Sequence, residues 1–134
     1  MIKFQELKNG DHVMADNEGD VKRGEITGFN KSEKQVCINT GAKDFWFEVD
    51  QLSAIPVTEE ELAVLKFTKQ PMDDGSIKYI KGAFRMLVPS NGDFSRYELW
   101  YRDEARHIHR SLAVHELQNH FYEMTKVHLN TVTF

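Results

Sequence analysis

The stretch Ala113–Met124, AVHELQNHFYEM, carries the longest helical pattern of the sequence. At 100° per residue, its apolar side chains fall within an arc of about 100°, the width of a helix face that packs on a core. These apolar residues are Ala113, Val114, Leu117, Phe121 and Met124. His115, Glu116, Asn119 and Glu123 fall on the opposite side. We therefore predict a helix with Ser111 as its N-cap, packed on a sheet made by the flanking strands.

The same stretch contains His115-Glu116 and His120, which resemble a zinc motif at first sight. The zinc protease motif H-E-x-x-H needs histidines four positions apart, so that both rings lie on one helix face. Here the second histidine comes five positions later, about 140° around the axis. Glu116 and His120 are the true i, i+4 pair, and we interpret them as a surface pair. A metal-dependent enzyme that uses them with His107 and His109 stays a third hypothesis.

Composition bounds the class of protein. The 134 residues have a net charge of −4 and 40% hydrophobic residues, typical of a globular domain. Cys37 is the only cysteine, which excludes an internal disulfide. The N-terminus has no signal-peptide core, and no window approaches the roughly 18 apolar residues of a membrane span. We expect a bacterial cytoplasmic protein without a membrane partner.

One region departs from the acidic average. Between Ile77 and Arg110 there are seven Lys and Arg residues against four acids. Solvent-exposed strand faces account for such an excess without any ligand. The alternative is a weak nucleic-acid-binding accessory protein that uses this basic segment, with Trp100 or Trp46 stacking on a base.

Residues 1–57 carry the pattern of a small barrel. Short β-like runs are predicted at 11–16, 21–30, 35–40 and 44–49, then one helical turn at 50–52 and a last strand at 53–57. Phe45, Phe47 and Val49 share one face of the fourth run. The order GD-x-V, V-x-x-G-x-I, V-x-I and an aromatic strand followed by x-x-L resembles the Tudor/SH3-like superfold. That resemblance implies an SH3-like β-barrel and no particular activity.

Residues 58–134 predict an α+β lobe. Thr58 and Glu61 form a capping box for a helix over 58–67, in which Leu62 and Leu65 face inward. A loop over 68–76, a three-stranded meander (77–88, 94–102 and 106–110), the helix and a terminal strand over 127–134 follow. The fold class is thus α+β with β in the majority. We expect the two lobes, 1–57 and 58–134, to pack as one unit.

The binding candidates are two tryptophans and the polar edge of the C-terminal helix. Trp46 faces away from Phe45 and Phe47, between Asp44 and Glu48, where it could receive a cation. The alternative is that Trp46 covers the interface between the lobes. Trp100, between Glu98 and Arg102, poses the same question.

Two blocks, FWFEVDQLSAIPVTEEELAVLKF (45–67) and AVHELQNHFYEMT (113–125), resemble a family of small uncharacterised bacterial and phage-associated proteins. Its members carry E-F-W-[FY]-E-x-x-x-L-x-x-I-P-[LV]-[ST]-E-E and end in V-H-x-L-Q-N-x-[YF]-x-x-L-T-G-x-E-L. This sequence departs from the second pattern at 124–129. The resemblance implies no substrate, cofactor or catalytic residue. Within it, His115, Gln118 and Asn119 are polar positions that could bond to the barrel lobe or to a partner.

These observations lead to one principal hypothesis. Nucleophile-elbow, P-loop and Rossmann glycine patterns are absent from the sequence. We predict a non-catalytic protein-interaction module without a cofactor or metal, which binds a protein partner or itself. Its binding residues are expected among Trp46, Trp100, His115, Gln118 and Asn119.

Overall fold

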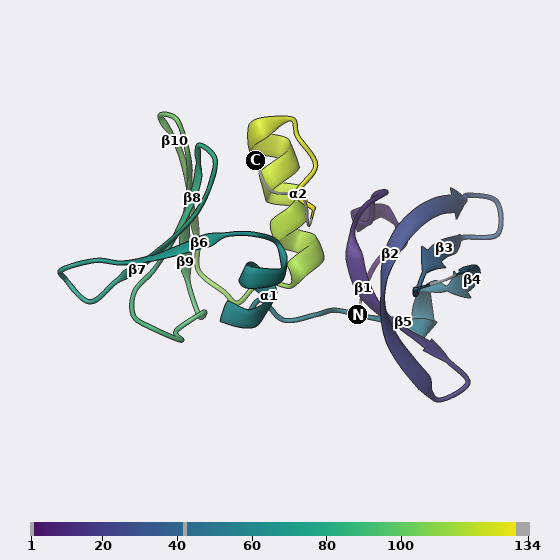
Figure 1. The fold of residues 1–134 in the computed structure, drawn as a ribbon. Helices are drawn as coiled ribbons and strands as arrows, with labels where there is room; N and C mark the ends of the chain where they lie inside the picture. Colours follow the sequence, from purple (N-terminus) through teal and green to yellow (C-terminus); the bar gives the residue numbers. More distant parts are fainter. Residues whose placement is uncertain (1, 42, 131–134) are drawn as a thin grey trace. The chain divides into compact units, whose positions relative to one another are not determined.

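The computed structural model describes residues 2–41 and 43–130, and in these the chain is α+β with β in the majority. In the described residues, two antiparallel five-stranded sheets account for all the strands, and one α-helix follows each sheet in the chain (Figure 1). The chain divides into two compact units. Unit 1 comprises 1–55 and 113–119, and unit 2 comprises 56–112 and 120–134.

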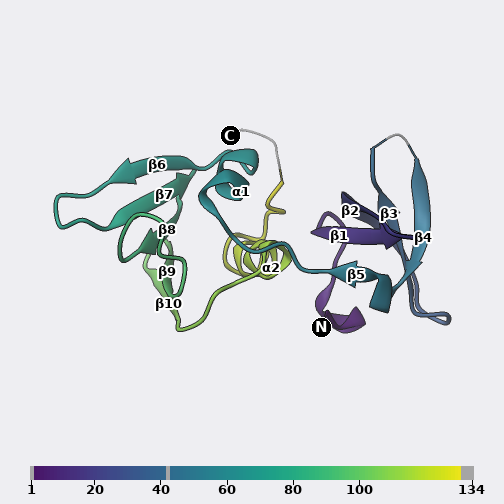
Figure 2. The same cartoon turned by 90° about the horizontal axis from the view of Figure 1, so that it is seen from below.

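The sheet of unit 1 has the order β4-β3-β2-β1-β5. Its elements are η1 (Phe4–Glu6), β1 (His12–Asn17), β2 (Asp20–Asn30), β3 (Gln35–Asn39), β4 (Asp44–Glu48), η2 (Val49–Gln51) and β5 (Leu52–Ser53). The four strand runs and the helical turn predicted from the sequence are therefore present, within a few residues of their expected ends. Alternation places Val13, Ala15, Ile26, Val36 and Ile38 in one buried core. The 3-10 turns η1 and η2 lie beside this sheet in Figure 2.

One inward position of unit 1 differs from the prediction. Phe47 is buried, but Phe45 leaves 43% of its surface exposed. The two residues share a face of β4, as the alternation predicts. The strand is the edge of the sheet, however, and the core ends before it reaches Phe45.

The sheet of unit 2 is a meander of order β10-β9-β8-β7-β6. Its elements are α1 (Glu59–Val64), β6 (Thr68–Pro71), β7 (Ile77–Lys81), β8 (Phe84–Val88), β9 (Tyr97–Tyr101) and β10 (Glu104–Ile108). Helix α1 begins as predicted, because the Thr58 hydroxyl accepts a hydrogen bond from the Glu61 amide at 3.2 Å. Leu62 and Leu65 are buried, also as predicted.

The prediction of three strands here was wrong, since there are five. The segment 77–88, predicted as one strand, is a hairpin that turns at Gly82-Ala83, and Gly82 has a φ of 60°. This positive φ is compatible with glycine and fits a tight two-residue turn. Thr68–Pro71, predicted as a loop, pairs with β7 as an edge strand. Its side chains are all exposed, so no buried face marks it in the sequence.

Helix α2 (Val114–Thr125) contributes residues to both units. Val114 and Leu117 are buried, and so are Phe121 and Met124, as the apolar arc predicts. The expected N-cap was wrong: the helix begins at Val114, two residues after the expected start, and Glu116 accepts a hydrogen bond from the Ala113 amide at 3.0 Å. No strand forms over Val127–Asn130. The rest of the predicted terminal strand, 131–134, lies outside the described residues.

No described helix has the length and apolar character that would let it cross a membrane.

Candidate functional site

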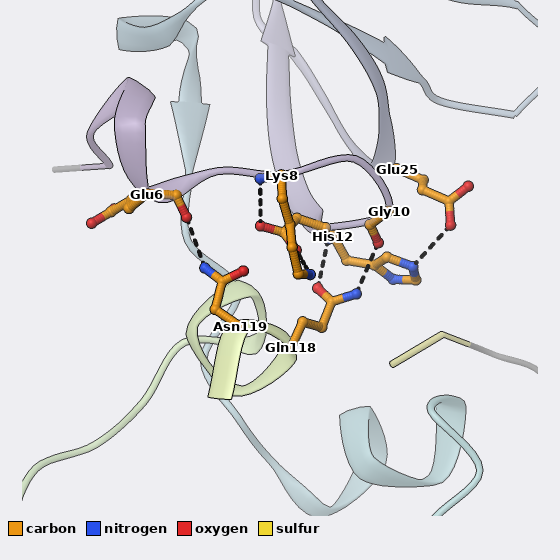
Figure 3. Close-up of polar contacts among 8 residues, drawn as sticks. Glu6, Lys8, Gly10, His12, Glu25, Gln118 and Asn119 are labelled. Atoms are coloured by element: carbon orange, nitrogen blue, oxygen red, sulfur yellow. Dashed lines mark hydrogen bonds and ion pairs between the residues drawn. The ribbon is translucent and has the colours of Figure 1, made fainter. Parts of the chain in front are cut away.

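The polar residues of α2 contact the N-terminal segment of unit 1 (Figure 3). The Gln118 side chain is fully buried and bonds two backbone groups: its oxygen accepts from the His12 amide, and its nitrogen donates to the Gly10 carbonyl, both at 2.8 Å. The Asn119 nitrogen donates to the Glu6 carbonyl at 2.7 Å. These bonds satisfy backbone groups that no strand partner would reach. They give Gln118 and Asn119 a structural role, and their role in binding a partner stays a prediction.

His115 is buried, which corrects its expected place on the outer side of the helix. Its Nε2 lies 3.4 Å from the Glu6 carboxylate, and its Nδ1 has no hydrogen-bond partner within the described part of the chain. Helical periodicity identifies only the apolar face that packs on a core. In unit 1 the segment around Glu6 also covers the polar side of the first helical turn, and so encloses this imidazole.

A buried carboxylate lies close to these contacts. Asp11 is fully buried, accepts a hydrogen bond from the Lys8 amide at 3.0 Å and pairs with the Lys8 ammonium. Burial raises the pKa of Asp11, and the bonds to Lys8 oppose that rise. Beside it, the His12 ring accepts from Arg23 at 2.7 Å and faces Glu25 at 3.6 Å. Every charged group here has a partner, which is the arrangement of a structural network.

The metal hypothesis finds no support in this geometry. Glu116 bonds Ala113 in unit 1, while in unit 2 the Arg106 guanidinium donates to His120 Nδ1 at 3.0 Å and contacts Glu123 at 2.7 Å. Among residues 2–41 and 43–130, no three His, Cys, Asp or Glu side chains gather as a metal site requires. Glu116 therefore bonds to the Ala113 amide and His120 to Arg106, so the i, i+4 spacing does not make them a shared site.

Trp100 lies on the outer face of the unit 2 sheet and is half-buried. Its Nε1 donates to Glu98 at 3.2 Å, and the Arg85 guanidinium lies over its ring at 5.7 Å. The face of the Trp100 ring that could receive a cation from a partner is thus already in contact with Arg85. The basic excess of this segment is also smaller than the sequence suggests, because Lys81 is buried against the carbonyls of Leu65 and Asn130.

Trp46 is the candidate that the structure leaves most accessible, with 53% of its surface exposed. It lies on β4, the edge strand of unit 1, which pairs on one side with β3 in the described part of the chain. Its cross-strand partner is Cys37, a small side chain that does not cover the indole. Glu48, two positions along the same face, accepts a hydrogen bond from Gln35 at 3.0 Å. An exposed aromatic side chain flanked by carboxylates on a sheet edge can receive a cation or an extended chain.

A second candidate site, of which the sequence indicated only the two histidines, lies in unit 2. His107 and His109 line a cavity of about 360 Å³ together with Arg96, Glu98 and Asp74. The acids and the arginine come from two other stretches of chain and were not predicted to belong with the histidines. For Glu98, the only signal in the sequence is the antiparallel pairing around the turn at 102–103, and no local pattern links Asp74 or Arg96 to the histidines.

No family model matches this chain, and no curated protein or solved structure matches it significantly.

Proposed function

We propose that this chain is a non-catalytic protein-interaction module, and that unit 1 binds a basic extended segment of a partner protein along β4. The observation that supports the proposal is the exposure of two adjacent aromatic residues, Phe45 and Trp46, on a sheet-edge strand. Soluble proteins usually protect an edge of this kind with charges or cover it. The strand order of unit 1 and the 3-10 turn before β5 support the narrower proposal that the unit is an SH3-like barrel.

The carboxylates of β4 indicate which kind of strand would bind beside it. Asp44, Trp46 and Glu48 share the outer face of β4 and are all exposed. A second copy paired antiparallel about Trp46 would place each Asp44 opposite a Glu48. Like charges directly opposite each other destabilise a sheet pair. A strand with lysine or arginine at alternate positions instead places one cation opposite each carboxylate and one over the indole. The acids therefore favour a basic partner over self-association.

The expected contributions are individually modest. Each opposite-charge cross-strand pair contributes about 0.2–1 kcal/mol, and an exposed cation–π contact about 0.5–1 kcal/mol. Backbone hydrogen bonds to the free edge of β4 add affinity that does not depend on side chains. We expect a binding mode that weakens as salt rises, because its charged groups are exposed.

The test is a titration of the ¹⁵N-labelled full chain with a capped Lys-Val-Lys-Val-Lys peptide, followed by NMR. We expect saturable shifts of the β4 amides and of the Trp46 indole N–H. The matched peptide Glu-Val-Glu-Val-Glu should cause none. Equal shifts with both peptides, or no shift of β4, would contradict the proposal.

Two variants separate the charges from general electrostatic attraction. Asp44→Asn with Glu48→Gln should weaken binding of the lysine peptide about tenfold, a loss of roughly 1.4 kcal/mol. Asp73→Asn with Asp103→Asn removes the same net charge from exposed turns of unit 2 and should change the affinity less than about twofold. Similar losses in both double variants would show that net charge, and not β4, attracts the peptide.

A further inference from the structure

The outer face of the unit 2 sheet ends in a cavity of about 360 Å³ where charges of both signs meet. The register places Leu87 opposite Glu98, and Glu98 opposite His107. Tyr97 pairs with Ile108 at the end of the ladder, and Arg96 and His109, the residues just beyond this pair, both line the cavity. Because alternate residues share a face, Glu98 and His107 lie on one side of the β9–β10 pair, and Arg96 and His109 line the same cavity at the end of these strands.

The acids of the cavity are held in place by hydrogen bonds. Asp74 accepts hydrogen bonds from the Ser76 amide at 3.0 Å and hydroxyl at 2.6 Å, and these bonds lower the pKa of Asp74. Glu98 accepts from the Trp100 indole at 3.2 Å. Both carboxylates keep further lone pairs for a ligand. Their orientation is fixed before a ligand arrives, which reduces the entropy cost of binding.

The cationic side of the cavity is less constrained. Within the described part of the chain, no hydrogen bond or ion pair holds the Arg96 guanidinium or the rings of His107 and His109. The charge of Arg96 does act on Asp93, which bonds mainly to Ser95. A guanidinium presents a fork of N–H donors that matches a carboxylate. His109, which lines the same cavity, offers a further donor to the same group.

Apart from Ser76, the rest of the lining is mainly apolar. Leu87, Val88, Tyr97 and Ile108 line the cavity, and the volume is in the range of small-molecule sites. A simple anion would meet the two fixed carboxylates, and a simple cation would meet Arg96. A ligand with separated charges of both signs avoids either repulsion.

We propose that this cavity binds a zwitterionic small molecule of the α-amino-acid type with an apolar side chain. The ligand carboxylate bonds to Arg96 and His109, the ammonium lies between Asp74 and Glu98, and the side chain packs on Leu87. This site belongs to unit 2 and does not depend on the peptide-binding proposal for β4.

The test uses four ligands on the ¹⁵N-labelled full chain: L-phenylalanine, L-leucine, 3-phenylpropionate and phenethylamine. We expect saturable shifts at Arg96, His107 and His109 with the two amino acids. The compounds that carry one charge should bind at least about tenfold more weakly. Equal binding by a singly charged compound, or no saturable shift with either amino acid up to about 10 mM, would overturn the proposal.

Variants assign the two charges to their residues. Arg96→Gln should weaken binding of L-phenylalanine about tenfold, whereas Arg85→Gln, on the same sheet but outside the cavity, should change it less than about twofold. Asp74→Asn with Glu98→Gln should weaken L-phenylalanine and leave 3-phenylpropionate unchanged or tighter. Equal effects of Arg96→Gln and Arg85→Gln, or loss of both ligands in the acid variant, would overturn the assignment. Unchanged amide spectra outside the cavity confirm that each variant is folded.

Discussion

The hydroxyl groups of two buried tyrosines in unit 2 differ in what they contact. Tyr97 Oη accepts a hydrogen bond from the Leu112 amide at 3.4 Å. Tyr79 Oη is buried and has no hydrogen-bond partner within the described residues. A buried polar group without a partner costs stability, whereas a bonded one is costly to remove. We expect Tyr79→Phe to raise the free energy of unfolding by up to about 1 kcal/mol and Tyr97→Phe to lower it by about 1 kcal/mol.

Urea denaturation of the two variants checks this expectation, and pH gives a second measurement. Burial raises the pKa of Tyr79 above its ordinary value, with Glu59 adding to the rise. The folded state therefore keeps a proton that the unfolded chain loses above about pH 10. The wild type should lose stability relative to Tyr79→Phe as the pH rises past that value. If Tyr79→Phe is as destabilising as Tyr97→Phe at pH 7, the Tyr79 hydroxyl has a hydrogen-bond partner, which would contradict the prediction.

Among the elements, strand β2 depends on one glycine for its packing on β3. A Cβ atom on Gly24 would lie 2.3 Å from Ile38 Cγ2 and 3.0 Å from the Asn39 carbonyl oxygen. Ile38 is fully buried and cannot move aside without displacing the core. We expect Gly24→Ala to lower the free energy of unfolding by about 1–3 kcal/mol, as overpacked cores do.

Gly28 on the same strand is the matched control. A Cβ atom there would meet only the Cys37 Cβ at 3.8 Å, an ordinary contact. Gly28→Ala should therefore change the free energy of unfolding by less than about 0.5 kcal/mol in urea denaturation. Equal losses of unfolding free energy at both positions would show that the backbone flexibility of glycine, and not the close approach of Gly24 to Ile38, determines the cost of substitution in β2.

At the level of the whole molecule, unit 1 is discontinuous in sequence, because it includes residues 113–119. Gln118 bonds Gly10 and His12, which lie more than 100 positions earlier in the chain. Gln118→Ala removes the bonds to the buried His12 amide and to the Gly10 carbonyl, at a cost of about 2–4 kcal/mol. We expect hydrogen exchange at the His12 amide to accelerate strongly.

Asn119→Ala is the control for that prediction, because it removes one bond at a partly exposed position. Its expected cost is about 0.5–1.5 kcal/mol. Equal effects of the two variants, or unchanged protection of the His12 amide in Gln118→Ala, would contradict the role that the bonds give to Gln118.

The prediction of secondary structure succeeded where a local pattern carries the information. The Thr58 cap, the inward leucines of α1 and the apolar arc of α2 follow from spacing alone. It failed at β6, which has no buried face, and at the hairpin inside 77–88, where Gly82-Ala83 is a weak turn signal. The candidate sites show the same difference. The sequence indicated Trp46 and the two histidines, but it did not indicate that Arg96, Glu98 and Asp74 line a cavity with the histidines.

By itself, the sequence determined the α+β class, the apolar face of α2 and the outward direction of Trp46, because each depends on the 3.6 or 2.0 residue period of a local element. The tertiary structure decided that β4 lies at a sheet edge, that His115 is enclosed and that Arg96 and His109 line one cavity. These are pairings between distant segments. In α2, the stretch AVHELQNHFYEM showed which side chains are apolar. The polar side of its first turn is also covered, by the segment around Glu6. Local periodicity gives no information about such a contact, because the contact forms only when a distant segment of the chain folds onto the helix.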